Sequence, residues 1–153
     1  MQQTTGGATS EFLKLLPELT ATLYRAAPHE AALRGPIKGP FTAAQMKAVI
    51  HLGLCGSQTM SEFATGLGIS RAAATEMVER LSEKSIVLRE PDVTDRRVVR
   101  VRLEPAAGRF VGRVLADWQR RLDGAFAEFP GLDRETLIAF LRTLTERLKG
   151  SLP

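Results

Sequence analysis

Residues 61–103 read SEFATGLGISRAAATEMVERLSEKSIVLREPDVTDRRVVRVRL and contain three successive patterns. The first predicts a short helix that Ser61 caps and that a tight turn at Gly68 ends. Ser70 then precedes a second helical pattern over residues 71–84. A short helix, a glycine-containing turn and a capped second helix together indicate a helix-turn-helix unit.

The third pattern predicts a two-stranded ribbon directly after the second helix, with strands near 86–90 and 98–103. Five of the fifteen residues from 89 to 103 are arginine, and a proline and an aspartate mark the turn. In the second strand, Val99, Val101 and Leu103 fall on one face, and Val98, Arg100 and Arg102 fall on the other. We therefore expect a half-buried ribbon with a basic outer surface, which makes the unit a winged helix-turn-helix.

Helical patterns flank this unit on both sides. Upstream, Thr42 and Gln45 have the spacing of a capping box, for a helix that stops near Gly56. Downstream, Pro105 opens a long helix, and Asp133 caps a last helix that ends at Gly150. The two downstream helices carry apolar stripes, which are Phe110, Val111, Val114, Leu115, Trp118 and Leu122 in one and Leu137, Ile138, Leu141, Leu144 and Leu148 in the other.

The N-terminal segment predicts another helix, capped by Ser10, after residues 1–9 without regular structure. Its apolar stripe consists of Phe12, Leu15, Leu16, Leu19 and Leu23. Pro17 interrupts this stripe and is expected to kink or restart the helix. Residues 27–40 contain three prolines and are expected to form a connector.

The expected fold class is mainly α, with a winged helix-turn-helix over residues 41–104 and dimerisation helices over 10–34 and 105–150. The chain has 153 residues, which is the usual size of a single domain, so we expect one domain over 1–153. The apolar stripes of the outer helices exceed what one winged helix can cover. A homodimer is therefore expected.

Composition limits the function classes. Net charge is +4, which favours an anionic partner. Cys55 is the single cysteine, so no internal disulfide can form and a reducing compartment is expected. The first twelve residues lack the pattern of a signal peptide, and no apolar run reaches the roughly 18 residues of a membrane span. We expect a cytoplasmic protein without membrane contact.

The second helix of a helix-turn-helix lies in the major groove of DNA, with its first residues near base edges. A projection of residues 71–84 at 100° per residue predicts that Ala74, Met77, Val78 and Leu81 lie on the buried face of this helix. The residues expected to contact double-stranded DNA are Ser70, Arg71, Ala72, Thr75, Glu76 and Arg80 on this helix and Asp95, Arg96, Arg97 and Arg100 on the ribbon. Arginine suits the ribbon because its guanidinium is always charged and is favoured in narrow minor grooves. Asp95 is expected to brace the guanidinium of Arg97.

Charge within this unit is balanced, because residues 61–104 contain eight Lys or Arg and eight Asp or Glu. Affinity is then expected to depend on the ribbon arginines, on the helix amides near Ser70 and on close approach at Ala72 and Ala73. Glu76 can accept a hydrogen bond from cytosine N4, although phosphates repel it. Arg120 and Arg121 are read as a solvated helix face, with contact to flanking phosphates as the alternative.

The segment SEFATGLGISRAAATEMVERLSEKSIVLREPDVTDRRVVRVRLEPAAGRF resembles the winged helix of MarR-type transcriptional regulators. The resemblance covers residues 41–110. The family's wing motif, Asp-x-Arg, matches Asp95 to Arg97, and FTAAQ and LEPAAGRF lie where the family has comparable signals. The resemblance implies a homodimer bound to a near-palindromic operator and often released by a small ligand, which we expect between the dimer helices and the winged helix.

Three positions depart from the family pattern. Ser85 follows the second helix where a glycine is usual, and a non-glycine residue with positive φ there costs about 1 kcal/mol. Leu103-Glu104 replaces the frequent Leu-Thr. Glu76 stands near a position that is often basic or an amide.

The leading prediction is thus a ligand-responsive repressor. A winged-helix protein-interaction module that uses its acidic helix face and does not bind DNA is the alternative. His51 and Cys55 share a helix face and could supply two metal ligands. Two ligands do not make a metal site, so no metal or cofactor is expected. An oxidant-sensing role of Cys55 is left open. No phosphate-binding loop, paired-histidine motif or nucleophile elbow is present, so no enzymatic activity is expected.

Overall fold

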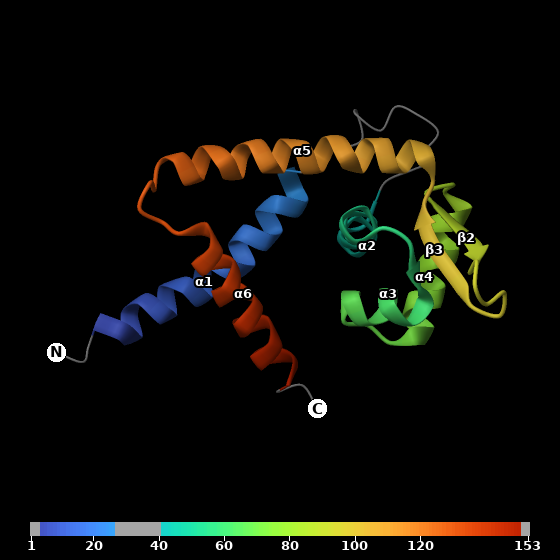
Figure 1. The fold of residues 1–153 in the computed structure, drawn as a ribbon, viewed down its shortest axis with the longest axis horizontal. Helices are drawn as coiled ribbons and strands as arrows, with labels where there is room; N and C mark the ends of the chain where they lie inside the picture. The colour runs from blue at the N-terminus through green and yellow to red at the C-terminus, as the bar shows by residue number, and fades with distance from the viewer. Residues whose placement is uncertain (1–3, 27–40, 151–153) are drawn as a thin grey trace. The chain divides into compact units, whose positions relative to one another are not determined.

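The computed structural model describes residues 4–26 and 41–150. Its elements are α1 (Thr4–Ala26), α2 (Ala43–Cys55), β1 (Gln58–Thr59), α3 (Met60–Leu67), α4 (Arg71–Glu83), β2 (Val87–Pro91), β3 (Val99–Leu103), α5 (Pro105–Ala127) and α6 (Arg134–Lys149). They form a mainly α fold with one small sheet, which confirms the predicted class (Figure 1). The chain divides into two compact units, residues 1–116 and 117–153, and α5 runs from the first into the second.

Helix α1 begins at Thr4, so the expectation of no regular structure is wrong for residues 4–9, and Ser10 is not its cap. The glycines in this segment cost about 1 kcal/mol each relative to alanine, but they keep the backbone N–H that a helix needs. Pro17 lies inside one continuous helix that bends along its length (Figure 1). Residues 1–3 and 27–40, which include the predicted connector and the end of the first dimerisation segment, lie outside the described residues.

Capping residues set where the helices of the helix-turn-helix region begin. Thr42 and Gln45 form the predicted capping box at the start of α2. The cap of α3 is Thr59 instead of Ser61, because Glu62 lies three residues after Thr59 and returns a hydrogen bond to its backbone N–H. Ser61 has an alanine at the corresponding position and cannot form this reciprocal pair.

Two turns set the path of the chain around α4. Gly68 adopts the left-handed conformation at φ 68° and ends α3. Ser70 caps α4 by accepting a hydrogen bond from the backbone N–H of Ala73 at 3.1 Å. After α4, Ser85 has φ 56°, and the N–H of Ile86 bonds the carbonyl of Leu81 at 3.0 Å. The positive φ expected at Ser85 is thereby confirmed.

The sheet has the order β1-β3-β2, and both pairs are antiparallel. Strand β1 was not predicted because two residues are too short to show an alternating pattern. In β3, Val101 is buried and Leu103 is half-buried, whereas Val99 beside the turn is exposed. The predicted inner face of the ribbon is therefore buried only at its base, and the end that carries the turn projects into solvent.

The core of the first unit lies between α2, α3, α4, the sheet and the start of α5. Its fully buried side chains include Ile50, Leu52, Phe63, Ala74, Val78, Leu81, Ile86, Val101, Val111 and Val114. Burial of each large aliphatic or aromatic side chain contributes about 1.5–3 kcal/mol. Helices α2 and α5 approach closely at Gly53, where an added Cβ would lie 2.2 Å from Cγ1 of Val111. This core supports α4 and the ribbon.

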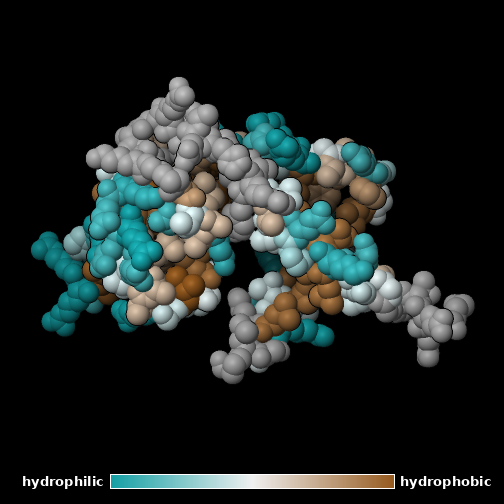
Figure 2. Space-filling view, turned by 180° about the vertical axis from the view of Figure 1, so that it is seen from behind, coloured by the Kyte–Doolittle hydropathy of each residue, from teal (hydrophilic) through white to brown (hydrophobic). Residues whose placement is uncertain are grey.

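The second unit contains the end of α5 and α6. Asp133 caps α6 as predicted, and Arg134 bonds Asp123 at 3.3 Å and covers the ring of Phe126. The predicted burial of the α6 stripe is wrong for the single chain, because Ile138 and Leu148 are 50% and 59% exposed. Leu13, Leu15 and Leu19 of α1 are exposed as well. Figure 2 shows such hydrophobic surface as brown areas between polar ones.

Candidate nucleic-acid interface

Helix α4 turns a polar face outward. Ala74, Val78 and Leu81 are fully buried and Met77 is half-buried, which confirms the projected inner face. The predicted contact residues of this helix, Ser70, Arg71, Ala72, Thr75, Glu76 and Arg80, are all exposed. The Ser70 cap leaves other N–H groups of the first turn without a helical acceptor, and such groups favour an anion.

The charges on α4 are partly paired with one another. Arg80 forms an ion pair with Glu76, one turn earlier. Arg89 of β2 lies 3.6 Å from Glu79 and donates to the carbonyl of Thr75 at 3.3 Å. Because these pairs are exposed, each adds little stability and can open when a stronger partner approaches.

The turn between β2 and β3 is fixed by two aspartates. The Asp92 carboxylate accepts from the hydroxyl and N–H of Thr94 and from the N–H of Asp95. These bonds, led by the Thr94 hydroxyl, and the bond from Arg100 hold the pKa of Asp92 well below its ordinary value of 3.8. The Asp95 carboxylate accepts from the N–H of Arg97 at 2.9 Å. The turn therefore has a defined backbone conformation.

Asp95 was expected to brace the guanidinium of Arg97, but it holds the backbone of that residue. Arg96 and Arg97 are both exposed, and neither guanidinium has an ion pair within the described parts of the chain. Val93 at the tip is 98% exposed. A rigid backbone thus presents two free cations.

Arg100 has a different environment. Its guanidinium donates to Asp92 at 3.0 Å and to the hydroxyl and carbonyl of Ser57 at 3.2 and 2.8 Å. Glu62, the capping residue of α3, lies 4.0 Å away. Arg100 therefore ties the ribbon to the start of the helix-turn-helix. No pattern in the sequence indicates this role of Ser57, whereas the spacing of Glu62 to Thr59 is recognisable as that of a capping box.

A cleft of about 420 Å³ separates the ribbon from the helix-turn-helix. Arg71 of α4 and Arg97 of the ribbon both line it. The hydroxyl-bearing residues Thr59, Ser61 and Thr75 line it as well. The cleft thus combines two guanidinium groups with hydrogen-bonding side chains, a chemistry suited to phosphate oxygens.

A second groove, of about 300 Å³, lies between α2, β3 and the start of α5. Its lining includes Leu52, Val111 and Leu115, four glycines and Arg102. Arg102 also bonds Glu90 at 2.8 Å. A mostly apolar groove with one charged group at its edge suits a small organic acid.

His51 and Cys55 lie together on α2, with Sγ 3.8 Å from Nδ1, and the thiol is exposed. Within residues 4–26 and 41–150, no cluster of three or more His, Cys, Asp or Glu could hold a metal ion. His29, the other histidine of the chain, lies outside the described residues. No helix of the described chain is both long and apolar enough to cross a membrane.

Comparison with known proteins shows what this part of the chain is similar to. Residues 41–99 match the MarR family model. The uncharacterized HTH-type transcriptional regulator YsmB of Bacillus subtilis (strain 168) is 30% identical over 74 residues, which cover 48% of this chain and 51% of YsmB. The matched region thus spans about half the length of that relative.

Solved structures share the fold over nearly the whole chain. RV1404 from Mycobacterium tuberculosis has a TM-score of 0.61 at 20% identity, with 100% of this chain and 98% of that chain covered. A mutant of MarR from E. coli complexed with operator DNA has a TM-score of 0.55 at 22% identity, with 94% and 93% covered. BpsR of Bordetella bronchiseptica, regulated by 6-hydroxynicotinic acid, has a TM-score of 0.57 at 18% identity, with 92% and 98% covered.

The family resemblance inferred from the sequence is confirmed, and the matched proteins are transcriptional regulators, not enzymes. The winged helix-turn-helix at residues 41–99 is thus similar to that of the MarR family, and the fold of the whole chain is that of the solved structures of such regulators.

Proposed function

We propose that the protein is a DNA-binding transcriptional regulator, and specifically a repressor that binds a near-palindromic operator as a homodimer. One observation carries this proposal. Arg71 of α4 and Arg97 of the wing, which is the ribbon formed by β2 and β3, line one cleft. The cleft lies beside the exposed face of α4 and beside a turn whose backbone is held by Asp95. A DNA backbone lying along this cleft would place α4 at the major groove and the wing at the adjacent minor groove.

Each contact residue then has a role. The major groove is contacted by the residues of α4 and its cap, which are Ser70, Arg71, Ala72, Thr75, Glu76 and Arg80. The minor groove or the backbone is contacted by Arg96 and Arg97. Asp95 holds the turn of the wing. We revise the role of Arg100 from DNA contact to positioning residue, because its guanidinium is bonded to Ser57 and Asp92.

The homodimer is supported by the exposed apolar side chains of the outer helices. Leu15 and Leu19 belong to the apolar stripe of α1, and Ile138, Leu141 and Leu148 belong to that of α6. Apolar stripes of this kind mark protein–protein contacts. We place the dimerisation segments at 10–34 and 105–150 of one domain in the cytoplasm, with recognition helices about 34 Å apart.

We further propose a small organic acid as effector, bound in the groove between α2, β3 and α5. The neighbouring folds include BpsR, regulated by 6-hydroxynicotinic acid, and NadR in complex with 4-hydroxyphenylacetate. A ligand that binds the DNA-free form about 1.4 kcal/mol more tightly would weaken operator binding tenfold.

The test is binding to DNA from upstream of the protein's own gene at several salt concentrations. A steep fall of log affinity with log salt is expected, and Arg97→Ala should reduce the slope by about one while lowering affinity. Lys14→Ala removes the same charge from α1 and should change neither the salt slope nor the affinity.

Glu76→Gln should alter the base preference at one position of the operator. A uniform gain in affinity on all DNA sequences would mean that Glu76 only repels phosphates.

The second candidate is a protein-interaction module that does not bind DNA. It is favoured by the acidic residues Glu76, Glu79 and Glu83, which are exposed on α4. In that case affinity for DNA would be negligible at physiological salt, and Arg97→Ala would have no effect.

A further inference from the structure

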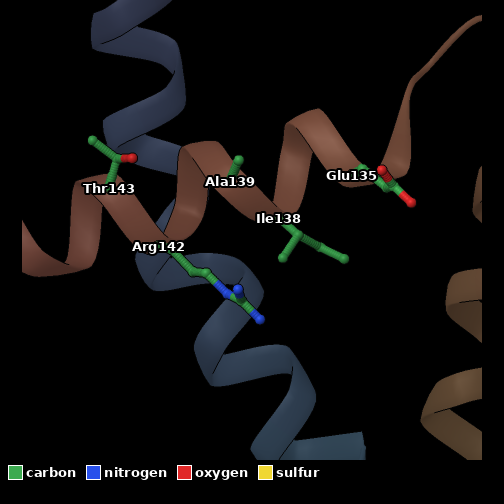
Figure 3. Close-up of a pocket in the computed structure, with 5 residues that line it drawn as sticks. All are labelled: Glu135, Ile138, Ala139, Arg142 and Thr143. Carbon is green, nitrogen blue, oxygen red and sulfur yellow. The ribbon is translucent and has the colours of Figure 1, made fainter.

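The groove between α2, β3 and α5 has walls from three elements. Leu52 comes from α2, Leu103 from β3, and Val111 and Leu115 from α5. A hollow of about 470 Å³ on α6 differs, because it is lined by five residues of that one helix, which are Glu135, Ile138, Ala139, Arg142 and Thr143 (Figure 3). A pocket that binds a small molecule surrounds most of the surface of that molecule. The groove with three walls is therefore the better ligand site.

Arg102 connects this groove with the wing. Among the described residues that line the groove, Arg102 alone is charged. Its Nε donates to the carboxylate of Glu90 in β2 at 2.8 Å, and its Nη1 donates to the carbonyl of Leu103 at 3.4 Å. A guanidinium has five N–H donors, so these two bonds leave donors for a second carboxylate.

The ion pair between Arg102 and Glu90 is open to competition. Both side chains are partly exposed, at 38% and 39%, and one hydrogen bond joins them. Ion pairs in contact with water are weak. An organic acid gains from burying its apolar body in the groove and can bind a guanidinium through both carboxylate oxygens. Such an acid can therefore take Arg102 from Glu90.

Glu90 lies between two arginines on one face of the ribbon. Arg100 is its direct partner in the register of β2 and β3, and Arg102 is two residues further along β3 on the same face. Arg100 is the positioning residue whose guanidinium bonds Asp92 and Ser57. A Glu90 carboxylate that is released from Arg102 therefore faces Arg100, within the reach of cross-strand pairs.

We propose that an organic acid in this groove weakens operator binding by an exchange of ion-pair partners along the ribbon. Its carboxylate pairs with Arg102, the released Glu90 turns to Arg100, and Arg100 loosens its bonds to Asp92 and Ser57. The turn of the wing then loses its tie to the start of the helix-turn-helix. This inference rests on the proposed effector-responsive regulator and specifies how the charge of the effector reaches the wing of the same protomer.

Titration calorimetry of the full-length protein with benzoate, 4-hydroxyphenylacetate and 6-hydroxynicotinate tests the first step. Arg102→Gln should weaken binding of the acids by about tenfold, because it removes a charged hydrogen-bond donor. Benzyl alcohol, which keeps the ring of benzoate without its charge, should bind wild type about tenfold more weakly than benzoate for the same reason. Arg113→Gln is the matched control, since it removes an equal charge from an exposed position of α5 outside the groove and should change nothing.

Gly112→Leu tests the location of the site. Gly112 lines the groove, and an added Cβ there meets nothing within 4 Å, so a larger side chain can enter the groove without a clash at Cβ. This variant should fold and should no longer bind the acids.

Glu90→Gln separates binding from response, because it keeps the groove and Arg102 but removes the charge that turns to Arg100. The acid should bind this variant at least as tightly as wild type, since its competitor is gone. In wild type the acid should lower affinity for the upstream DNA by about tenfold and speed amide hydrogen exchange at residues 92–98. Neither effect should occur in Glu90→Gln.

The outcomes distinguish the steps. Equal binding of the acids to wild type and Arg102→Gln would overturn the role of Arg102. A Glu90→Gln variant that responds like wild type would overturn the partner exchange, while binding in the groove would stand. If none of the three acids binds wild type, the effector site and the partner exchange both fail. Failure of the proposed function would instead appear as absence of DNA binding by the acid-free protein, and amide exchange at residues 92–98 would still test the partner exchange without DNA.

Discussion

Ser85 is a residue whose conformation conflicts with its side chain. It has φ 56° between α4 and β2, and it is the only non-glycine residue with positive φ within residues 4–26 and 41–150. A Cβ in the left-handed region meets the following carbonyl oxygen, which costs about 1–2 kcal/mol. The hydrogen bond from Ser85 N–H to the carbonyl of Ser82, at 2.9 Å, holds the turn despite this cost.

Ser85→Gly should stabilise the protein by about 0.5–1 kcal/mol, because glycine relieves the steric cost but gains entropy in the unfolded chain. Urea unfolding measures the change. Ser85→Ala is the matched control, since it removes the hydroxyl and keeps Cβ, and it should give no gain. Equal stabilisation by both variants would show that the hydroxyl is the unfavourable group.

Among the elements, the wing shows how far sequence could predict the structure. Alternation in β3 and the Pro and Asp of the turn were sufficient to predict a ribbon behind α4. The partners of its arginines were not predictable, because Ser57 is far from Arg100 in sequence and its position depends on the pairing of β1 with β3. Likewise, Thr59 replaced Ser61 as cap because the capping box with Glu62 outweighs local preference.

Replacement of Arg100 by methionine, which keeps much of the length and apolar surface, separates the two roles considered for this residue. We expect a loss of about 1–2 kcal/mol in stability from the broken bonds to Ser57 and Asp92. DNA affinity should fall with an unchanged salt slope, since the guanidinium positions the wing without contacting phosphate. A slope reduced by about one, like that expected for Arg97→Ala, would instead identify a phosphate contact.

The wing should also make stability depend on acidity. The folded pKa of Asp92 is lowered by Thr94 and Arg100, so its carboxylate stabilises the fold above its ordinary value of 3.8 and loses this effect as pH falls below that value. Asp92→Asn should therefore destabilise the protein near neutral pH, with a difference from wild type that shrinks in acid. Unfolding curves between about pH 7 and pH 2 test this. A difference that is constant with pH would contradict it.

For the whole molecule, the sequence correctly predicts an apolar stripe on α6 but not the exposure of that stripe in a single chain. A sequence does not reveal whether the surface that covers a stripe belongs to the same chain or to another one. Ile138, Leu141 and Leu148 remain exposed in one chain. The same applies to Leu15 and Leu19 of the α1 stripe. The winged helix-turn-helix, by contrast, buries its core within one chain and was predicted with few errors.

If a second chain covers these stripes, stability should depend on protein concentration. The melting temperature should rise over a roughly hundredfold increase in concentration, because association stabilises the folded state by mass action. Leu141→Glu should lower the melting temperature and remove the dependence, since it puts a charge into the contact. A melting temperature independent of concentration in wild type would exclude obligate pairing.

The close approach of α2 and α5 has a consequence for variation at glycine. At Gly53 any added carbon meets Val111, whereas at Gly108 and Gly112 it meets nothing within 4 Å. In a random library selected for folded protein, position 53 should remain glycine while alanine becomes common at the other two. Over evolutionary time, glycine-to-alanine substitutions should therefore accumulate at positions 108 and 112 of α5 but not at position 53 of α2.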